Sequence, residues 1–97
     1  MEVEVRFFGS FREVLQKSRL SFTIPDSGEL VYLVKTIHDR IDQDSRSNYF
    51  KNENGTPVPS RSTLILIDGI EHRALDGLST VLNRSNEICF ITSIHGG

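Results

Sequence analysis

The sequence ends in two glycines, Gly96 and Gly97, whose type and position suggest chemistry at the chain terminus. Two terminal glycines are expected by chance in about one protein in 200, because Gly makes up roughly 7% of residues. Without a Cβ, such an end can thread a narrow enzyme channel in conformations closed to other residues. The unhindered carboxylate of Gly97 could then attack the α-phosphate of ATP and become an acyl-adenylate. An ordinary frayed chain end is the alternative interpretation.

The other reactive side chains form no catalytic or metal-binding pattern. The single cysteine, Cys89, excludes an internal disulfide and lies in the apolar run 88–91. That setting favours a small buried residue over a reactive thiol. The three histidines, His38, His72 and His95, have no ligand-like spacing, so we expect no metal and no cofactor. Because no nucleophile stands beside a base, we do not expect an enzyme.

Length and charge limit the remaining classes. The 97 residues predict one domain over 1–97, with 95–97 as a flexible tail. A net charge of −2 gives no reason to expect direct binding of nucleic acid. No apolar run approaches the roughly 18 residues that cross a bilayer, and the first residues lack signal-peptide features. We therefore expect a cytoplasmic protein that does not bind membranes.

The elements that would position the terminus follow from hydrophobic periodicity. Val3, Val5 and Phe7 alternate with charged residues and predict a strand with one buried face. A second alternation over residues 20–24 predicts its partner in a hairpin. Between these strands, the sequence favours a turn at residues 9–10 and one irregular helical turn.

A helix is predicted after this hairpin. Asp26 stands three residues before Glu29, a capping-box-like pair that predicts a helix start near Asp26 or Ser27. The apolar positions fall on one helical face, which should pack against the sheet. These positions are Leu30, Leu33, Val34, Ile37 and Ile41.

The second half of the chain reads as a long loop followed by strands. Residues 42–62 are polar and predict an exposed loop anchored by Tyr49 and Phe50. Residues 64–67 predict a strand, and Asp68-Gly69 a tight hairpin turn into a short strand near residues 70–73. After a compact turn, residues 87–94 predict the final strand.

This order of elements predicts an α+β fold of the β-grasp (ubiquitin-like) type. We expect a mixed four- to five-stranded sheet crossed by one main helix, with a flexible diglycine tail at its C-terminus. The first and last strands should be adjacent and parallel in the middle of the sheet, because the last strand is almost wholly apolar.

The chain resembles a known family in three places. Its end, Phe90-Ile91-Thr92-Ser93-Ile94-His95-Gly96-Gly97, is similar to the Phe-Ile-Ser-Thr-Leu-His-Gly-Gly-like end of the ubiquitin-related modifier family. Residues 64–69 and 5–9 resemble strands of the same superfamily, which includes the bacterial proteins MoaD and ThiS. The sequence departs from the family pattern in two places. It has no Trp in residues 70–74, and residues 59–62 lack the usual Arg-Pro-Gly run.

The resemblance implies a ubiquitin-like sulfur carrier. A ubiquitin-activating-type adenylyltransferase would activate Gly97, and a sulfurtransferase would convert it to a thiocarboxylate. A tRNA thiolation enzyme would then pass the sulfur to a wobble uridine, with conjugation of the carrier to protein lysines as a second fate. Gly96 and His95 would take part in tail recognition. His95 favours the tRNA branch over the MoaD and ThiS branches, whose tails differ there.

Two alternatives to this carrier function stay open at the level of sequence. The chain could be a MoaD-like small subunit of molybdopterin synthase, or a non-covalent β-grasp interaction domain. For a carrier, the sheet face opposite the helix is the expected docking surface for the activating enzyme. Phe8 is a candidate exposed apolar residue on that face, and packing under a loop is its alternative.

Overall fold

The computed structural model describes residues 1–92, and its first strands follow the alternation of the sequence. Strand β1 (Glu2–Phe8) buries Val3, Val5 and Phe7 and exposes the residues between them. A short helix, α1 (Ser10–Leu15), leads to β2 (Arg19–Thr23), which pairs antiparallel with β1. The predicted hairpin and the helical turn inside its connection are therefore confirmed.

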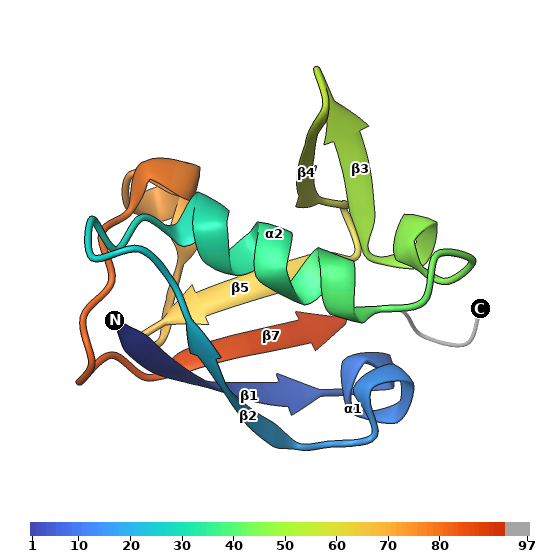
Figure 1. Ribbon diagram of the computed structural model, residues 1–97, viewed down its shortest axis with the longest axis horizontal. Coiled ribbons are helices and arrows are strands. Elements are labelled where there is room, and N and C mark those ends of the chain that lie inside the picture. The colour runs from blue at the N-terminus through green and yellow to red at the C-terminus, as the bar shows by residue number, and fades with distance from the viewer. Residues whose placement is uncertain (93–97) are drawn as a thin grey trace.

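The main helix, α2 (Leu30–Arg40), lies across one face of the sheet (Figure 1). Its predicted apolar face is confirmed, because all five positions are at most 1% exposed. The first four belong to the helix, and the fifth immediately follows its last residue. These side chains form the helical half of the core: Leu30, Leu33, Val34, Ile37 and Ile41.

The start of α2 differs from the sequence expectation. The pair of Asp26 and Glu29 predicted a start near Asp26 or Ser27, but the first helical residue is Leu30 and no side chain caps it. The amide of Leu30 donates instead to the carbonyl of Thr80, at 2.8 Å. The predicted start is wrong because a distant backbone segment satisfies the amide that a side-chain cap would have satisfied.

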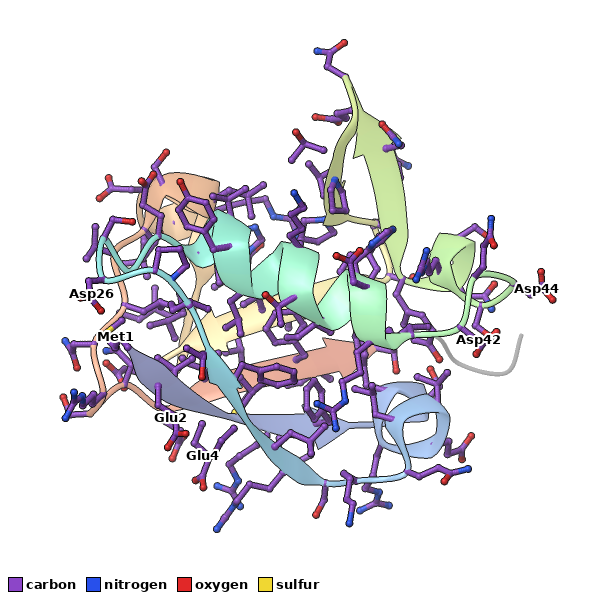
Figure 2. All side chains as sticks on the ribbon, viewed as in Figure 1. Met1, Glu2, Glu4, Asp26, Asp42 and Asp44 are labelled. Atoms are coloured by element: carbon purple, nitrogen blue, oxygen red, sulfur yellow. The ribbon has the colours of Figure 1, made fainter. Side chains whose placement is uncertain are left out.

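Asp26 has a different partner, the chain's own amino group. The α-amino group of Met1 donates to Asp26 Oδ1 at 3.0 Å and to the carbonyl of Ile24 at 2.8 Å. Figure 2 shows Met1 and Asp26 side by side at this end of the molecule. The hydrogen bond from the amino group, together with its positive charge, lowers the pKa of Asp26.

Residues 42–62 do not form the long exposed loop that their polar composition predicted. They contain one turn of 3₁₀ helix, η1 (Arg46–Asn48), and a hairpin of β3 (Phe50–Glu53) and β4 (Thr56–Pro59). In Figure 1 this hairpin stands away from the main sheet.

A two-residue turn explains the hairpin. Asn54 and Gly55 have φ angles of 54° and 84°, and Asn-Gly is the pair that best tolerates two such angles in succession. The predicted anchor of this segment is confirmed, because Tyr49 and Phe50 are each 5% exposed. The polar residues that suggested a loop occupy the exposed positions of a small sheet.

The remaining elements complete the main sheet. The Asp68-Gly69 turn joins two strands as predicted, with the second ending where a 3₁₀ turn begins at His72. These elements are β5 (Thr63–Ile67), β6 (Ile70–Glu71), the turns η2 (His72–Ala74) and η3 (Gly77–Ser79), and β7 (Ile88–Thr92).

The five strands of the main sheet lie in the order β2-β1-β7-β5-β6. Strands β1 and β7 are parallel, and the other neighbours are antiparallel. The predicted mixed sheet, with its first and last strands adjacent at the centre, is confirmed. Within residues 1–92, no helix has the length and apolar character needed to cross a membrane.

The core lies between α2 and the sheet, and aromatic rings fill the end where α1 closes it. Phe11 is fully buried, with its ring centroid 4.4 Å from that of Tyr49 and 5.7 Å from that of Phe90. The ring centroid of Phe7 lies 6.0 Å from that of Phe11 and 6.0 Å from that of Phe90. This cluster ties α1 and the segment before β3 to the central strands.

Candidate functional site

The predicted reactive residues lie just beyond the part of the chain that the structure describes. Gly97, Gly96 and His95 are all outside residues 1–92. The structure does show where their segment begins, because Thr92 is the last residue of β7. Strand β7 pairs with β1 on one side as far as Ile91 and with β5 on the other as far as Thr92.

Hydrogen bonds from the start of α1 hold the end of β7. The amide of Ser10 donates to Thr92 Oγ1 at 3.0 Å, and the Ser10 hydroxyl donates to the same oxygen at 3.1 Å. Sequence reasoning interpreted residues 9–10 only as a turn. The pairing of β1 with β7 brings these residues together across 82 positions of the chain, and local sequence carries no signal of that register.

The sheet face opposite α2 is the second part of the candidate site, and we call it the open face. Strand register places Phe8 beside Ile91, and Ile91 beside Leu64. It also places Cys89 beside Leu66. Phe8 is 39% exposed, which fits the predicted surface position rather than packing under a loop. Its neighbours Ile91, Leu64 and Leu66 are partly exposed, so the three central strands present a continuous apolar band.

Charged side chains border this band on the side of β1 and β2. Arg6 lies beside Cys89 in the sheet, and its guanidinium carbon is 5.9 Å from the centroid of the Phe8 ring. The same guanidinium is 3.9 Å from Glu87, and Arg19 is 3.6 Å from Glu4. These exposed pairs contribute little to stability, but they give the apolar band a charged edge.

Cys89 is buried at 9% exposure, as its apolar surroundings predicted. Burial, reinforced by the negative charge of Glu87, raises the pKa of the thiol. A raised pKa keeps the sulfur in its unreactive thiol form at neutral pH. The structure therefore gives Cys89 the environment of a packing residue and not that of a nucleophile.

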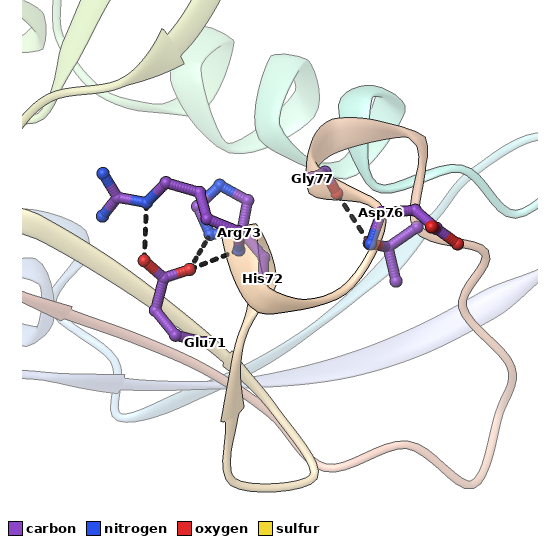
Figure 3. A network of polar contacts seen from close by, with 6 residues as sticks. Glu71, His72, Arg73, Asp76 and Gly77 are labelled. Carbon is purple, nitrogen blue, oxygen red and sulfur yellow. Dashed lines mark hydrogen bonds and ion pairs between the residues drawn. The ribbon is translucent and has the colours of Figure 1, made fainter.

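A polar cluster at η2 brings together three further titratable side chains, Glu71, His72 and Arg73 (Figure 3). The carboxylate of Glu71 accepts hydrogen bonds from the backbone and guanidinium of Arg73. His72 is 4% exposed, with Nδ1 2.9 Å from Glu71 Oε2, although the contact is not aligned as a hydrogen bond. Burial lowers the pKa of His72 more than Glu71 raises it.

This cluster does not have the composition of a catalytic site. It borders a shallow hollow of about 290 Å³ between η2, η3 and the β3–β4 hairpin. Among residues 1–92, no group of three or more His, Cys, Asp or Glu side chains is arranged to hold a metal ion. Glu71 and Arg73 neutralise each other, and no Ser, Thr or Cys side chain lines the hollow.

Comparison with known proteins points to one family. The family model described as Urm1 (ubiquitin related modifier) matches residues 2–97, which includes the diglycine end. No curated protein matches the sequence.

Solved structures agree with that match. The small archaeal modifier protein 1 of Methanosarcina acetivorans has a TM-score of 0.79 and 25% identity, covering 99% of this chain and 96% of that one. The HVO 2177 protein of Haloferax volcanii has a TM-score of 0.76 and 25% identity, covering 100% and 87%. Urm1 from Trypanosoma brucei has a TM-score of 0.72 and 22% identity, covering 99% and 95%. These likenesses confirm the predicted β-grasp fold.

Proposed function

Because the chain belongs to the ubiquitin-related modifier family, we propose that it is a protein carrier whose reactive group is the carboxylate of Gly97. The observation that carries this proposal is the family match, which extends from residue 2 to Gly97 itself. The chain itself would not be an enzyme in this function, because the acyl-activating chemistry belongs to a partner.

The proposed chemistry has two steps. A carboxylate oxygen of Gly97 attacks the α-phosphate of ATP, and the bond to pyrophosphate breaks to leave an acyl-adenylate. A hydrosulfide ion from the donor then attacks the Gly97 carbonyl carbon and gives up its proton to solvent, and the bond to AMP breaks. The products are AMP and a chain that ends in a thiocarboxylate. A glycine carboxylate suits both steps because no side chain hinders attack at its carbon.

The open face is the proposed docking surface for the activating enzyme. It combines the partly exposed apolar side chains of β1, β5 and β7 with a charged edge at Arg6. An apolar centre with a polar border is the usual composition of a protein–protein contact. The end of β7 lies at the margin of this face, so an enzyme docked there would receive the residues that follow Thr92.

We propose that the sulfur is delivered to a wobble uridine of tRNA by a tRNA thiolation enzyme. His95, which precedes the two glycines, supports this acceptor through its resemblance to tails of the tRNA branch. Conjugation of Gly97 to lysines of other proteins is the second proposed fate of the activated chain. Because the proposed acceptor is a tRNA, we propose the cytoplasm as the compartment.

Intact-mass measurement tests this function. The chain is incubated with its activating enzyme, ATP and a sulfur donor, and replacement of one carboxylate oxygen by sulfur adds about 16 Da. Omission of ATP should abolish the shift, because the donor sulfur has no leaving group to displace. An unchanged mass in the complete mixture would contradict the carrier function and favour a non-covalent interaction domain.

A further inference from the structure

We propose that Thr92 is a positioning residue for the activation of Gly97, because the hydrogen bonds from Ser10 fix the point where the C-terminal segment leaves the fold. We call the arrangement of Gly9, Ser10 and Thr92 the clasp. This inference rests on the proposed function, since it concerns how Gly97 is presented to the activating enzyme.

The clasp lies at the end of β7, just beyond the last residue that β7 pairs with β1. On the β5 side, Thr92 is paired with Thr63. On the β1 side, the register ends one residue earlier, with Phe8 beside Ile91. Beyond Phe8 the chain turns into α1, so β1 gives Thr92 no strand neighbour. The Ser10 side chain and amide fill that place.

Two donors converge on a single side-chain oxygen. The Ser10 amide and hydroxyl lie 3.0 and 3.1 Å from Thr92 Oγ1. A hydroxyl oxygen has two acceptor lone pairs, so both are occupied. The interaction therefore depends on the Thr92 hydroxyl and is lost if an apolar side chain of the same shape replaces it.

Gly9 permits this close approach. A Cβ at residue 9 would lie 2.5 Å from Thr92 Oγ1, and the φ of Gly9 is +66°. Both the backbone conformation and the contact with Thr92 therefore require glycine at this position. The close packing of Gly9 on Thr92 makes the clasp a built contact and not a chance approach of surface groups.

Ser10 is itself held from the core, so it can act as a fixed point. The Tyr49 hydroxyl donates to the Ser10 carbonyl at 3.2 Å. The Tyr49 ring packs on Phe11, which is fully buried. The clasp thus connects the end of β7 to the aromatic cluster through α1.

The functional consequence is that the short segment ending in Gly97 starts from a fixed point, Thr92. Five residues, 93–97, follow Thr92 in the sequence. Each extended residue spans at most about 3.3–3.6 Å, so the position of Thr92 limits where the Gly97 carboxylate can be placed. If the clasp opens, the activating enzyme must also order residues that the fold now orders. That ordering should weaken productive binding about 5- to 30-fold per residue.

Threonine-to-valine and threonine-to-serine substitutions test the clasp. Thr92→Val keeps the β-branched shape and removes the acceptor, while Thr92→Ser keeps the hydroxyl. In ATP–pyrophosphate exchange with the activating enzyme, Thr92→Val should raise the KM for the carrier about 5- to 30-fold and leave kcat within about twofold. Thr92→Ser should stay near the wild-type KM. The matched control is Thr23→Val, an exposed residue at the end of β2.

The outcomes separate this inference from the proposed function. If the wild-type chain supports exchange and Thr92→Val has the wild-type KM, the clasp is overturned while the carrier function stands. A fall in kcat with unchanged KM also overturns it. If the wild-type chain supports no exchange with its activating enzyme, the proposed function fails and the clasp inference fails with it.

Hydrogen exchange tests the clasp without any variant. In the wild-type protein, the Ser10 amide should exchange more slowly than an exposed amide, because it donates to Thr92. The same amide should lose its protection in Thr92→Val and keep it in Thr92→Ser. Exchange of the Ser10 amide at the rate of an exposed amide in the wild-type protein would overturn the inference, even if Thr92→Val failed to fold.

Discussion

At the scale of single residues, His72 is a buried side chain whose protonation the fold changes. It is 4% exposed and borders the hollow beside the β3–β4 hairpin. Burial lowers its pKa, while the neighbouring Glu71 acts in the opposite direction and Arg73 acts with burial. Lys51 and Glu53 of β3 line the same hollow. The folded protein therefore favours neutral His72.

A pH dependence of stability follows from this shift. Because the folded pKa lies below the unfolded value of 6.5, the unfolded state binds more protons as the pH falls through 6.5. We expect the free energy of unfolding to decrease between pH 7.5 and 5.5, as measured by urea denaturation. His72→Gln should reduce this decrease. The matched control is His38→Gln, at a more exposed site, because it leaves His72 in place.

Glu71 does not interfere with that measurement. Burial favours its neutral form, but hydrogen bonds from the Arg73 backbone and side chain outweigh this and lower the pKa of Glu71 from 4.5. Its contribution to stability is therefore lost only at pH values below the range of the experiment. A His72→Gln variant with the full wild-type pH dependence would contradict the role assigned to His72.

At the scale of elements, α2 supplies four fully buried side chains to the core. Leu33 is fully buried in the middle of its apolar face. Leu33→Ala should lower the free energy of unfolding by about 2–4 kcal/mol, because it removes buried methyl groups and leaves a cavity. Denaturant titration measures the change. Val81→Ala, at a side chain that is 65% exposed, is the matched control and should change stability by less than about 0.5 kcal/mol.

Most elements of the main sheet could be predicted from sequence, because alternation reports directly which face of a strand is buried. The residues at Val3, Val5 and Phe7 gave a clear pattern of this kind. The β3–β4 hairpin was missed because each strand has only four residues, β3 is polar and exposed after Phe50, and β4 contains two prolines. The Asn54-Gly55 pair is a local signal that could have identified it.

Contacts between distant segments could not be predicted in the same way. The start of α2 depends on a hydrogen bond from Leu30 to Thr80, which lies 50 positions away in sequence. The clasp likewise depends on the register of β1 with β7. For the candidate site, the sequence predicted the terminus, which stays a prediction, and an exposed Phe8, which is confirmed, but the surroundings of Thr92 required the fold.

At the scale of the whole molecule, β7 takes part in the core, the open face and the clasp. Its residues Ile88 and Phe90 pack into the core beneath α2. Its residues Cys89 and Ile91 belong to the open face, and Thr92 ends the strand at the clasp. One central strand therefore connects the stability of the fold, the proposed docking surface and the segment that carries Gly97.

The two faces of the molecule allow a matched test of docking. Phe8 on the open face and Tyr32 on α2 are each 39% exposed. Phe8→Ala should raise the KM of the activating enzyme for the carrier at least about fivefold, because loss of an aromatic contact residue often costs more than 1 kcal/mol. Tyr32→Ala should leave the KM unchanged. Equal effects of the two substitutions would show that the open face is not the docking surface.

The most direct test of the carrier function is ATP–pyrophosphate exchange by the activating enzyme with a chain that lacks Gly97. Deletion shortens the tail by about 3.3–3.6 Å. Adenylation needs the reacting atoms about 3–3.5 Å apart, so exchange should be almost abolished. A residue appended after Gly97 should also block exchange, because the glycine carboxylate becomes a peptide carbonyl. Neither change alters the core, so stability should stay within about 0.5 kcal/mol of the wild type. Wild-type exchange by the truncated chain would contradict the carrier function and leave an interaction domain in its place.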